Sequence, residues 1–270
     1  MDASLVPILL ALGAAIGFLA GLLGIGGGLT LIPVLTFIFT TQHFAEDHIV
    51  HMAVATATAT MVFTALSSVG AHHRQKAVLW PIVYAMAPGI VIGSLVGPQL
   101  ASALPTRAFA AVFGLFVWFS ATRMLLIAGR PQPGRELPGR LPLLGVGAGI
   151  GVISSLLGAG GAFISVPYLG RHNVRMQSAV ATSAALGLPI AVAGTIGFIV
   201  AGLRQADLPR WSAGYVYLPA MAAIVVASML CAPLGAHFAH RWPAVKLRRA
   251  FAVLLYTLGA YMLWKALKSG

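Results

Sequence analysis

Two clusters of glycine are the residues best placed to form a binding site. Their members are Gly24, Gly26, Gly27 and Gly28 in the first cluster and Gly158, Gly160 and Gly161 in the second. Each cluster lies inside a long apolar segment and is followed by a proline, Pro33 or Pro167, which we interpret as a structural hinge. Glycine lets the backbone turn through positive φ and lets a ligand approach it closely. Each cluster therefore predicts a break in a helix, at which backbone groups are free to bind a ligand.

The chemistry that such breaks favour is anion binding. A helix that restarts near Leu29 or Phe163 points its free N–H groups at the break, and a helix N-terminus carries about half a positive charge. All five acidic residues fall in expected loops, whereas the polar side chains of the apolar segments are mainly hydroxyls. We expect four of these to help bind a substrate: Thr30, Thr56, Ser165 and Thr182. The alternative is that the glycines serve close helix packing and the threonines bond their own backbone.

Histidines supply the remaining titratable groups of interest. His51 and His72 are candidates for carrying protons, because histidine titrates near neutrality and no acid is expected at membrane depth. Solvated residues near a membrane interface are the competing interpretation. His48 and His51 follow Glu46 and Asp47, a spacing that could ligate a metal. We nevertheless predict neither a metal nor a cofactor.

The composition indicates a single membrane body. Of 270 residues, 59% are hydrophobic and 8% are charged, against about 25% charged in soluble proteins. A bilayer takes about 20 helical residues to cross. The long apolar blocks are 5–40, 49–71, 78–101, 108–128, 141–169, 178–202, 213–236 and 250–267. The net charge of +12 lies largely in short loops, so it predicts orientation in the membrane rather than nucleic-acid binding. Cys231 is the single cysteine, which argues against a thiol–disulfide relay, since a relay needs paired thiols.

The chain also repeats itself. The glycine clusters and their prolines match at an offset of 134, and 53–56 is identical to 179–182. We therefore divide the chain into a first transmembrane repeat (1–128), a loop linker (129–140) and a second transmembrane repeat (141–270). The predicted fold is an all-α polytopic membrane protein. Each half would have a glycine-broken hairpin plus three spanning helices, which gives 8 to 10 membrane helices.

The loop charges favour inverted repeats. If each broken segment crosses the membrane once, the 17 Lys and Arg divide 10 to 7 between the two sides. If each is a hairpin, they divide 12 to 5, which is the bias expected when the rich side is cytoplasmic. This second count predicts that both termini are periplasmic. It also directs two helix N-termini at one shared centre from opposite sides.

These motifs resemble a known family. The run 22–28 with Pro33, its second copy at 156–162 with Pro167, and the two Ala-Val-Ala-Thr segments are similar to the TauE/SafE sulfite exporter family, also called the 4-toluene sulfonate uptake permease family. The resemblance covers essentially the whole chain. It implies a secondary transporter of the bacterial inner membrane for sulfite, sulfonates or related organosulfur anions. Ala162 stands where the first copy has Gly28, so the two half-sites are not identical.

The leading hypothesis is a secondary carrier, not an enzyme, that exports a small sulfur-containing anion by alternating access. Its expected partners are that anion and the lipid bilayer. The alternatives are an uptake permease for another small anion, and a non-transporting membrane assembly or redox component. The sequence leaves the exact substrate, the direction, ion coupling and the oligomeric state open.

Overall fold

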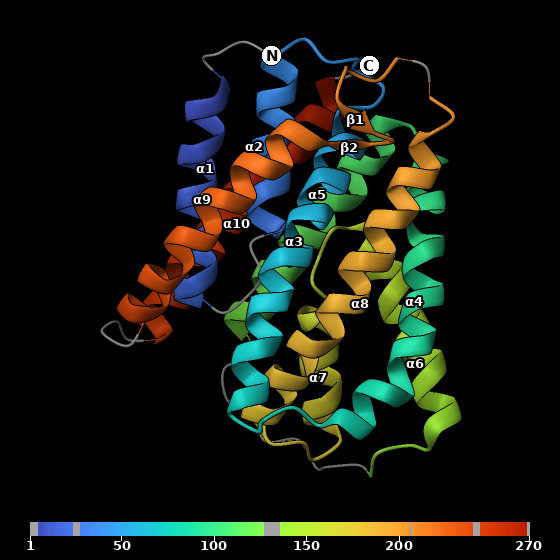
Figure 1. The fold of residues 1–270 in the computed structure, drawn as a ribbon, viewed down its shortest axis with the longest axis vertical. Helices are drawn as coiled ribbons and strands as arrows, with labels where there is room; N and C mark the ends of the chain where they lie inside the picture. The colour runs from blue at the N-terminus through green and yellow to red at the C-terminus, as the bar shows by residue number, and fades with distance from the viewer. Residues whose placement is uncertain (1–4, 24–27, 127–135, 206, 240–243, 269–270) are drawn as a thin grey trace.

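The computed structural model describes residues 5–23, 28–126, 136–205, 207–239 and 244–268. Within these residues the chain forms ten α-helices and one pair of short strands (Figure 1). The helices are α1 (Leu5–Leu23), α2 (Gly28–Thr41), α3 (Ile49–Arg74), α4 (Trp80–Ser102), α5 (Thr106–Leu126), α6 (Arg140–Leu156), α7 (Ala162–Arg171), α8 (Met176–Gly202), α9 (Leu218–Ala239) and α10 (Ala244–Lys268). The strands are β1 (Ser212–Ala213) and β2 (Val216–Tyr217). Gly24, Gly26 and Gly27 of the predicted site lie outside the described residues.

Two helix pairs form hairpins that face opposite ends of the molecule (Figure 1). α1 runs down from the end drawn at the top, called here the upper end, and α2 returns to it. α6 runs up from the opposite, lower end, and α7 returns there. α3, α4 and α8 run between the two ends, and α10 finishes at the upper end where α1 begins. The two hairpins therefore meet within the helical body from opposite directions.

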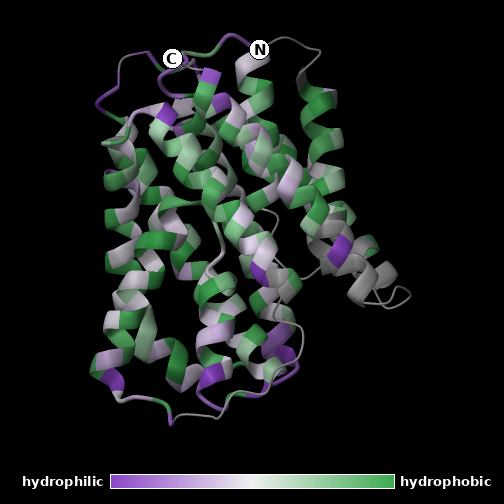
Figure 2. Ribbon diagram, turned by 180° about the vertical axis from the view of Figure 1, so that it is seen from behind, coloured by the Kyte–Doolittle hydropathy of each residue, from purple (hydrophilic) through white to green (hydrophobic). Residues whose placement is uncertain are grey.

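The distribution of hydrophobic residues is that of a multi-pass helical membrane protein. Figure 2 shows hydrophobic residues along the helices and hydrophilic residues gathered mainly at the two ends. Among the described residues, α3, α4 and α8 are long and apolar enough to cross a membrane, and α2 and α6 are apolar but shorter. The expected all-α membrane class is confirmed at this level, and the expected blocks coincide with these helices.

One short element departs from the expected blocks. The block 213–236 was expected to be helical throughout, but β1 and β2 pair antiparallel ahead of α9, with Ser212 opposite Tyr217. Gly214 makes the turn between them with φ +54°, a conformation that side-chain-bearing residues rarely adopt. A turn at this glycine thus forms where the apolar pattern predicted a helix, and α9 begins five residues after the start of the block.

Glycines let two pairs of helices approach closely. A Cβ on Gly93 of α4 would overlap the Ala148 carbonyl oxygen of α6. On the other side of the molecule, a Cβ on Gly13 of α1 would lie 2.8 Å from the Cα of Ile224 in α9. Small residues at helix contacts are the usual means of close packing in membranes. α4 therefore packs along α6, and α1 along α9.

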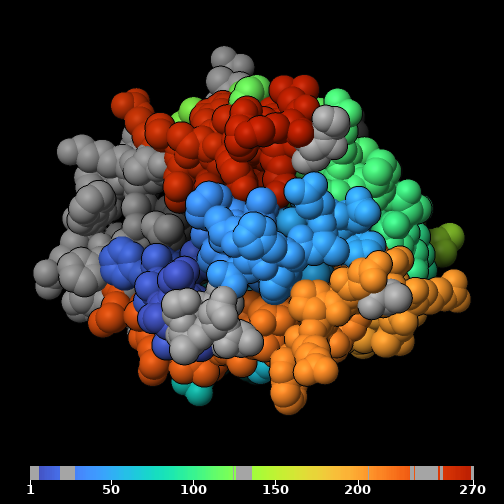
Figure 3. Space-filling view, turned by 90° about the horizontal axis from the view of Figure 1, so that it is seen from above, coloured from blue at the N-terminus to red at the C-terminus, as the bar shows by residue number. Residues whose placement is uncertain are grey.

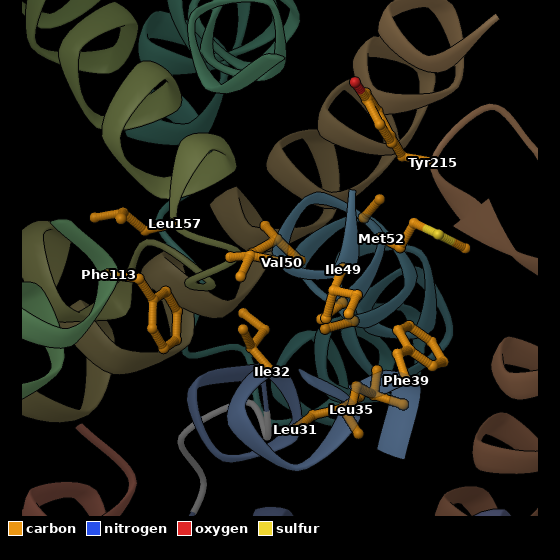
Figure 4. Packing of buried hydrophobic residues seen from close by; sticks show 14 of the residues in the cluster. Leu31, Ile32, Leu35, Phe39, Ile49, Val50, Met52, Phe113, Leu157 and Tyr215 are labelled. Atoms are coloured by element: carbon orange, nitrogen blue, oxygen red, sulfur yellow. The ribbon is translucent and has the colours of Figure 1, made fainter. Parts of the chain in front are cut away.

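The largest buried cluster surrounds α2 and the first half of α3. Figure 4 shows Leu35 and Phe39 of α2 beside Ile49 of α3. Phe39 also stacks on Phe44 with ring centroids 4.9 Å apart. This packing holds α2 against α3 and so fixes the position at which α2 starts, next to the second glycine cluster.

Candidate functional site

The start of α2 meets the loop between α6 and α7. A Cβ on Gly28 would overlap the carbonyl oxygen of Gly158 and would lie 2.8 Å from the sulfur of Met61 in α3. Met61 also limits the space at Gly160, where a Cβ would lie 3.1 Å from its methyl carbon. We call this contact between Gly28 and residues 158–161 the glycine crossing. It brings one described member of the first predicted cluster together with the second cluster.

The second cluster needs glycine for its backbone conformation. Gly158 and Gly161 have φ of +57° and +74°, in the left-handed region. Gly161 is the N-cap of α7, and its carbonyl oxygen accepts from the amides of Ile164 and Ser165. The amides of Ala162 and Phe163 precede these two bonds and have no acceptor within the helix. The crossing therefore exposes N–H groups at the positive end of α7.

One buried hydroxyl at the crossing lacks a partner. Ser154 of α6 is 1% exposed, and its Oγ has no hydrogen-bond partner in the described structure. This oxygen would lie 3.6 Å from a Cβ on Gly161. An unsatisfied buried hydroxyl costs about 1–3 kcal/mol, so it is retained where something else compensates for it. A ligand that accepts from Ser154 and from the amides of α7 would satisfy both.

Sequence reasoning missed Ser154. The available signal is its position four residues before the second glycine cluster, in a helix that packs on α4. Serines in helices usually bond the carbonyl one turn earlier, as Thr58 does with Val54 at 2.8 Å. Only the three-dimensional structure distinguishes a serine whose hydroxyl bonds its own helix from one whose hydroxyl has no hydrogen-bond partner.

Ser165 lies one turn into α7 and is fully buried. Its Oγ is 2.9 Å from the Gly161 carbonyl oxygen and 2.8 Å from the Oγ of Ser183 in α8. It thus supports the N-cap of α7 directly and ties α7 to α8. Thr30 occupies the first turn of α2 and is 3% exposed. The structure therefore places Ser165 and Thr30 in the first turns of the two helices that meet at the crossing.

Thr56 and Thr182 have a common role at the ends of other helices. The Oγ1 of Thr56 accepts from the amide of Tyr217, the residue before α9, at 3.0 Å. The Oγ1 of Thr182 accepts from the amide of Leu79, the N-cap of α4, also at 3.0 Å. Both hydroxyls therefore satisfy an amide that the helix itself leaves without an acceptor.

Pro33 and Pro167, the predicted hinges, lie inside α2 and α7 rather than at their ends. A proline within a helix removes one backbone hydrogen bond and bends the helix at that point. Each proline follows the crossing by between one and two turns, so a bend there would move the outer part of the helix relative to its start.

His51 and His72 do not lie together. His51 is buried in the first turn of α3, with Nε2 2.9 Å from the Ala101 carbonyl oxygen and its ring 5.3 Å from that of Tyr215. A tyrosine hydroxyl is neutral near pH 7, and burial raises the pKa of Tyr215 further above that range. His72 lies in the last turn of α3, at the lower end. Within the described residues no group of three His, Cys, Asp or Glu could hold a metal.

The long apolar helices and the two opposed hairpins define the class as a multi-pass helical membrane protein. A family model described as "Sulfite exporter TauE/SafE" matches residues 9–262, so the chain belongs to this family. It is similar to a "Probable membrane transporter protein" of Haemophilus influenzae, with 32% identity over 256 residues that cover 95% of this chain and 97% of that protein. It is 28% identical to "Probable membrane transporter protein YdhB" of Bacillus subtilis over 92% of this chain and 96% of that protein. No solved structure matches. The names of the family and of these relatives indicate a membrane transporter.

Proposed function

We propose that this protein is a secondary carrier that exports a small sulfur-containing anion, such as sulfite or a sulfonate, across the bacterial inner membrane by alternating access. The observation that carries this proposal is the glycine crossing. The starts of α2 and α7 approach one place from opposite ends, beside the unused hydroxyl of Ser154. Helix N-termini and a hydroxyl donor bind an oxyanion without a basic side chain. The family description supports sulfite and export.

The proposal includes two inverted repeats, and paired contacts support it. α1 packs along α9 as α6 packs along α4, which is the relation expected if each half repeats the other upside down. The threonines agree, since Thr56 and Thr182 occupy the same place in the repeated Ala-Val-Ala-Thr segment. Their partners Tyr217 and Leu79 each lie two residues before a proline. In this topology the lower, arginine-rich end faces the cytoplasm and both termini are periplasmic.

A binding screen tests the proposal. Purified protein in detergent is heated with sulfite, thiosulfate, sulfoacetate, taurine or sulfate, and the unfolding midpoint is recorded. A ligand at about 100 times its Kd adds about 2.7 kcal/mol to the stability of the folded state. We expect at least one of the sulfur oxyanions to raise the midpoint. If none of them does, and none is transported, the proposed function is wrong.

Gly161→Val locates the site within the protein. A side chain at φ +74° is strained, and its Cβ would lie 2.6 Å from Ile190 Cδ1, so the start of α7 must shift. The matched control is Gly170→Val in the same helix, where a Cβ meets nothing within 4 Å. We expect the ligand-induced shift to disappear in the first variant and to persist in the second. A folded Gly161→Val protein with an unchanged shift would place the site elsewhere.

A further inference from the structure

A second cavity lies between α5 and α7, towards the lower end. It has a volume of about 280 Å³. α5 contributes Phe116, Ser120 and Arg123, and α7 contributes Phe163, Tyr168 and Arg171. A water molecule occupies about 30 Å³ in the liquid, so the cavity has room for a partly hydrated oxyanion.

The polar groups of this cavity suit an anion. Arg123 and Arg171 both line it, and none of its described lining residues is acidic. Ser120 is 2% exposed, and its Oγ has no hydrogen-bond partner in the described structure. Two guanidinium groups and an unused hydroxyl can all donate hydrogen bonds to an oxyanion, and the two guanidinium groups are permanently charged. A different cavity, of about 720 Å³ at the upper end, is lined by Glu46 and Asp47 as well as Arg107.

Helix α7 extends from the crossing to the cavity. Phe163 is in the first turn of this helix, next to the N-cap Gly161, and Arg171 is its last residue. At 1.5 Å per residue, the lining from Phe163 to Arg171 extends about 12 Å along α7. An anion in the cavity therefore lies one helix length or less from the amides at the start of α7.

In the other half, α2 and α10 are in contact at the corresponding place. Lys265 of α10 lies 142 residues after Arg123, the offset that also separates Arg107 from Arg249. Its Nζ donates a hydrogen bond to the Oγ1 of Thr40 in α2. Nearby, the rings of Phe37 in α2 and Tyr261 in α10 pack edge to face, with their centroids 6.2 Å apart. Figure 3 shows the segment around residues 28–50 filling the middle of the upper face between α10 and the segment around 200–217. Helices α2 and α10 are thus joined at the upper end.

We propose that the α5–α7 cavity is an entry subsite for the transported anion on the arginine-rich end, and that the α2–α10 contact fills the equivalent place at the other end in this structure. Arg123 and Arg171 attract the oxyanion, and Ser120 donates to it before it moves to the crossing. This inference rests on the proposed function for the identity of the anion. The positive character of the cavity does not depend on transport, and it is measured separately.

The first measurement is the rate of thiol modification of Ser120→Cys in a Cys231→Ser background. An anionic and a cationic methanethiosulfonate reagent of similar size are compared. Because positive charge concentrates anions in a cleft, we expect the anionic reagent to react about ten-fold faster relative to its rate with a free thiol. Adding Arg123→Gln and Arg171→Gln should abolish the preference, whereas Arg74→Gln, at the same end but outside the cavity, should preserve it. Equal relative rates for the two reagents would overturn the subsite.

The second measurement is transport into oriented liposomes with sulfite supplied at either end. With Ser120 and Cys231 in place, the Arg123→Gln, Arg171→Gln protein should have a KM about ten-fold higher for sulfite supplied at the arginine-rich end. The KM from the other end should change less than two-fold, and lysine at both positions should restore most of the affinity. An equal rise from both ends would indicate a structural role and overturn the proposal. A charge preference at Ser120→Cys without any transport by the wild type would retain the anion site and reject the carrier.

Discussion

The hydroxyl of Ser154 provides the sharpest test at the scale of single residues. It is buried at the glycine crossing without a partner, so it destabilises the empty protein. We predict that Ser154→Ala raises the free energy of unfolding by about 1 kcal/mol in the absence of anion. The same change should weaken anion binding about ten-fold, because a hydrogen bond to a charged ligand contributes about 1.5–3 kcal/mol. Both effects are measured by thermal unfolding with and without sulfite.

The control for this prediction is Ser228→Ala. Ser228 is buried in α9, and its hydroxyl bonds the Val225 carbonyl oxygen of its own helix. The variant should leave anion affinity unchanged. If Ser154→Ala binds sulfite as tightly as the wild type does, Ser154 does not contact the anion.

The second prediction at this scale is that Thr56 and Thr182 contribute to the stability of the protein but not to its affinity for the anion. Each hydroxyl accepts a backbone amide at a helix start. Thr56→Val and Thr182→Val leave that amide without an acceptor, which costs about 1–3 kcal/mol. We expect lower unfolding midpoints with sulfite affinity within about two-fold of the wild type. A loss of sulfite affinity without a loss of stability would instead indicate that these threonines contact the anion.

The sequence could identify some of these residues but not their roles. Gly158 and Gly161 were predicted to lie at a helix break because glycine readily adopts positive φ, and both residues have positive φ in the structure. Ser154 is not recognisable, because an unpaired hydroxyl is a property of its surroundings rather than of its residue type. Thr56 and Thr182 were expected to bind the substrate because both are threonines in the repeated segment. The structure shows that their hydroxyls also accept hydrogen bonds from backbone amides next to helix starts.

At the scale of elements, the contact between α4 and α6 depends on which face of α6 each glycine occupies. A Cβ on Gly151 would lie 2.5 Å from the Ile90 carbonyl oxygen, whereas a Cβ on Gly149 meets nothing within 4 Å. We predict that Gly151→Ala destabilises the protein by about 1–3 kcal/mol through overpacking. Gly149→Ala should be neutral or stabilising by up to about 1 kcal/mol, because alanine favours the helix. Unfolding midpoints in detergent distinguish the two, and equal midpoints would contradict the close contact.

The elements were largely predictable from block length and glycine position. The blocks 5–40 and 141–169 are too long for one crossing, and the structure divides them into α1 with α2 and α6 with α7. The β1–β2 pair was not predictable from hydropathy, because three of its four residues lie in the apolar block 213–236 that becomes α9. Which helices pack together was also not evident, since glycine permits a close contact without specifying the partner.

At the scale of the whole molecule, the hairpin arrangement predicts the location of each loop. A reporter that is active only in the periplasm should be active when fused after Gly270 and inactive when inserted after Arg74. The reason is that α10 ends at the upper end and α3 ends at the lower, arginine-rich end. Activity at Arg74 with none at Gly270 would reverse the orientation, and equal activity would contradict the topology.

The central claim is that a sulfur oxyanion crosses the membrane through the glycine crossing, and exchange of labelled sulfite in liposomes tests it most directly. Purified protein is reconstituted, and entry of labelled sulfite is measured with and without unlabelled sulfite inside. The account predicts saturable entry that internal sulfite accelerates, that Gly170→Val retains and that Gly161→Val abolishes. Entry no faster than in protein-free liposomes, for sulfite and for the sulfonates alike, would contradict it.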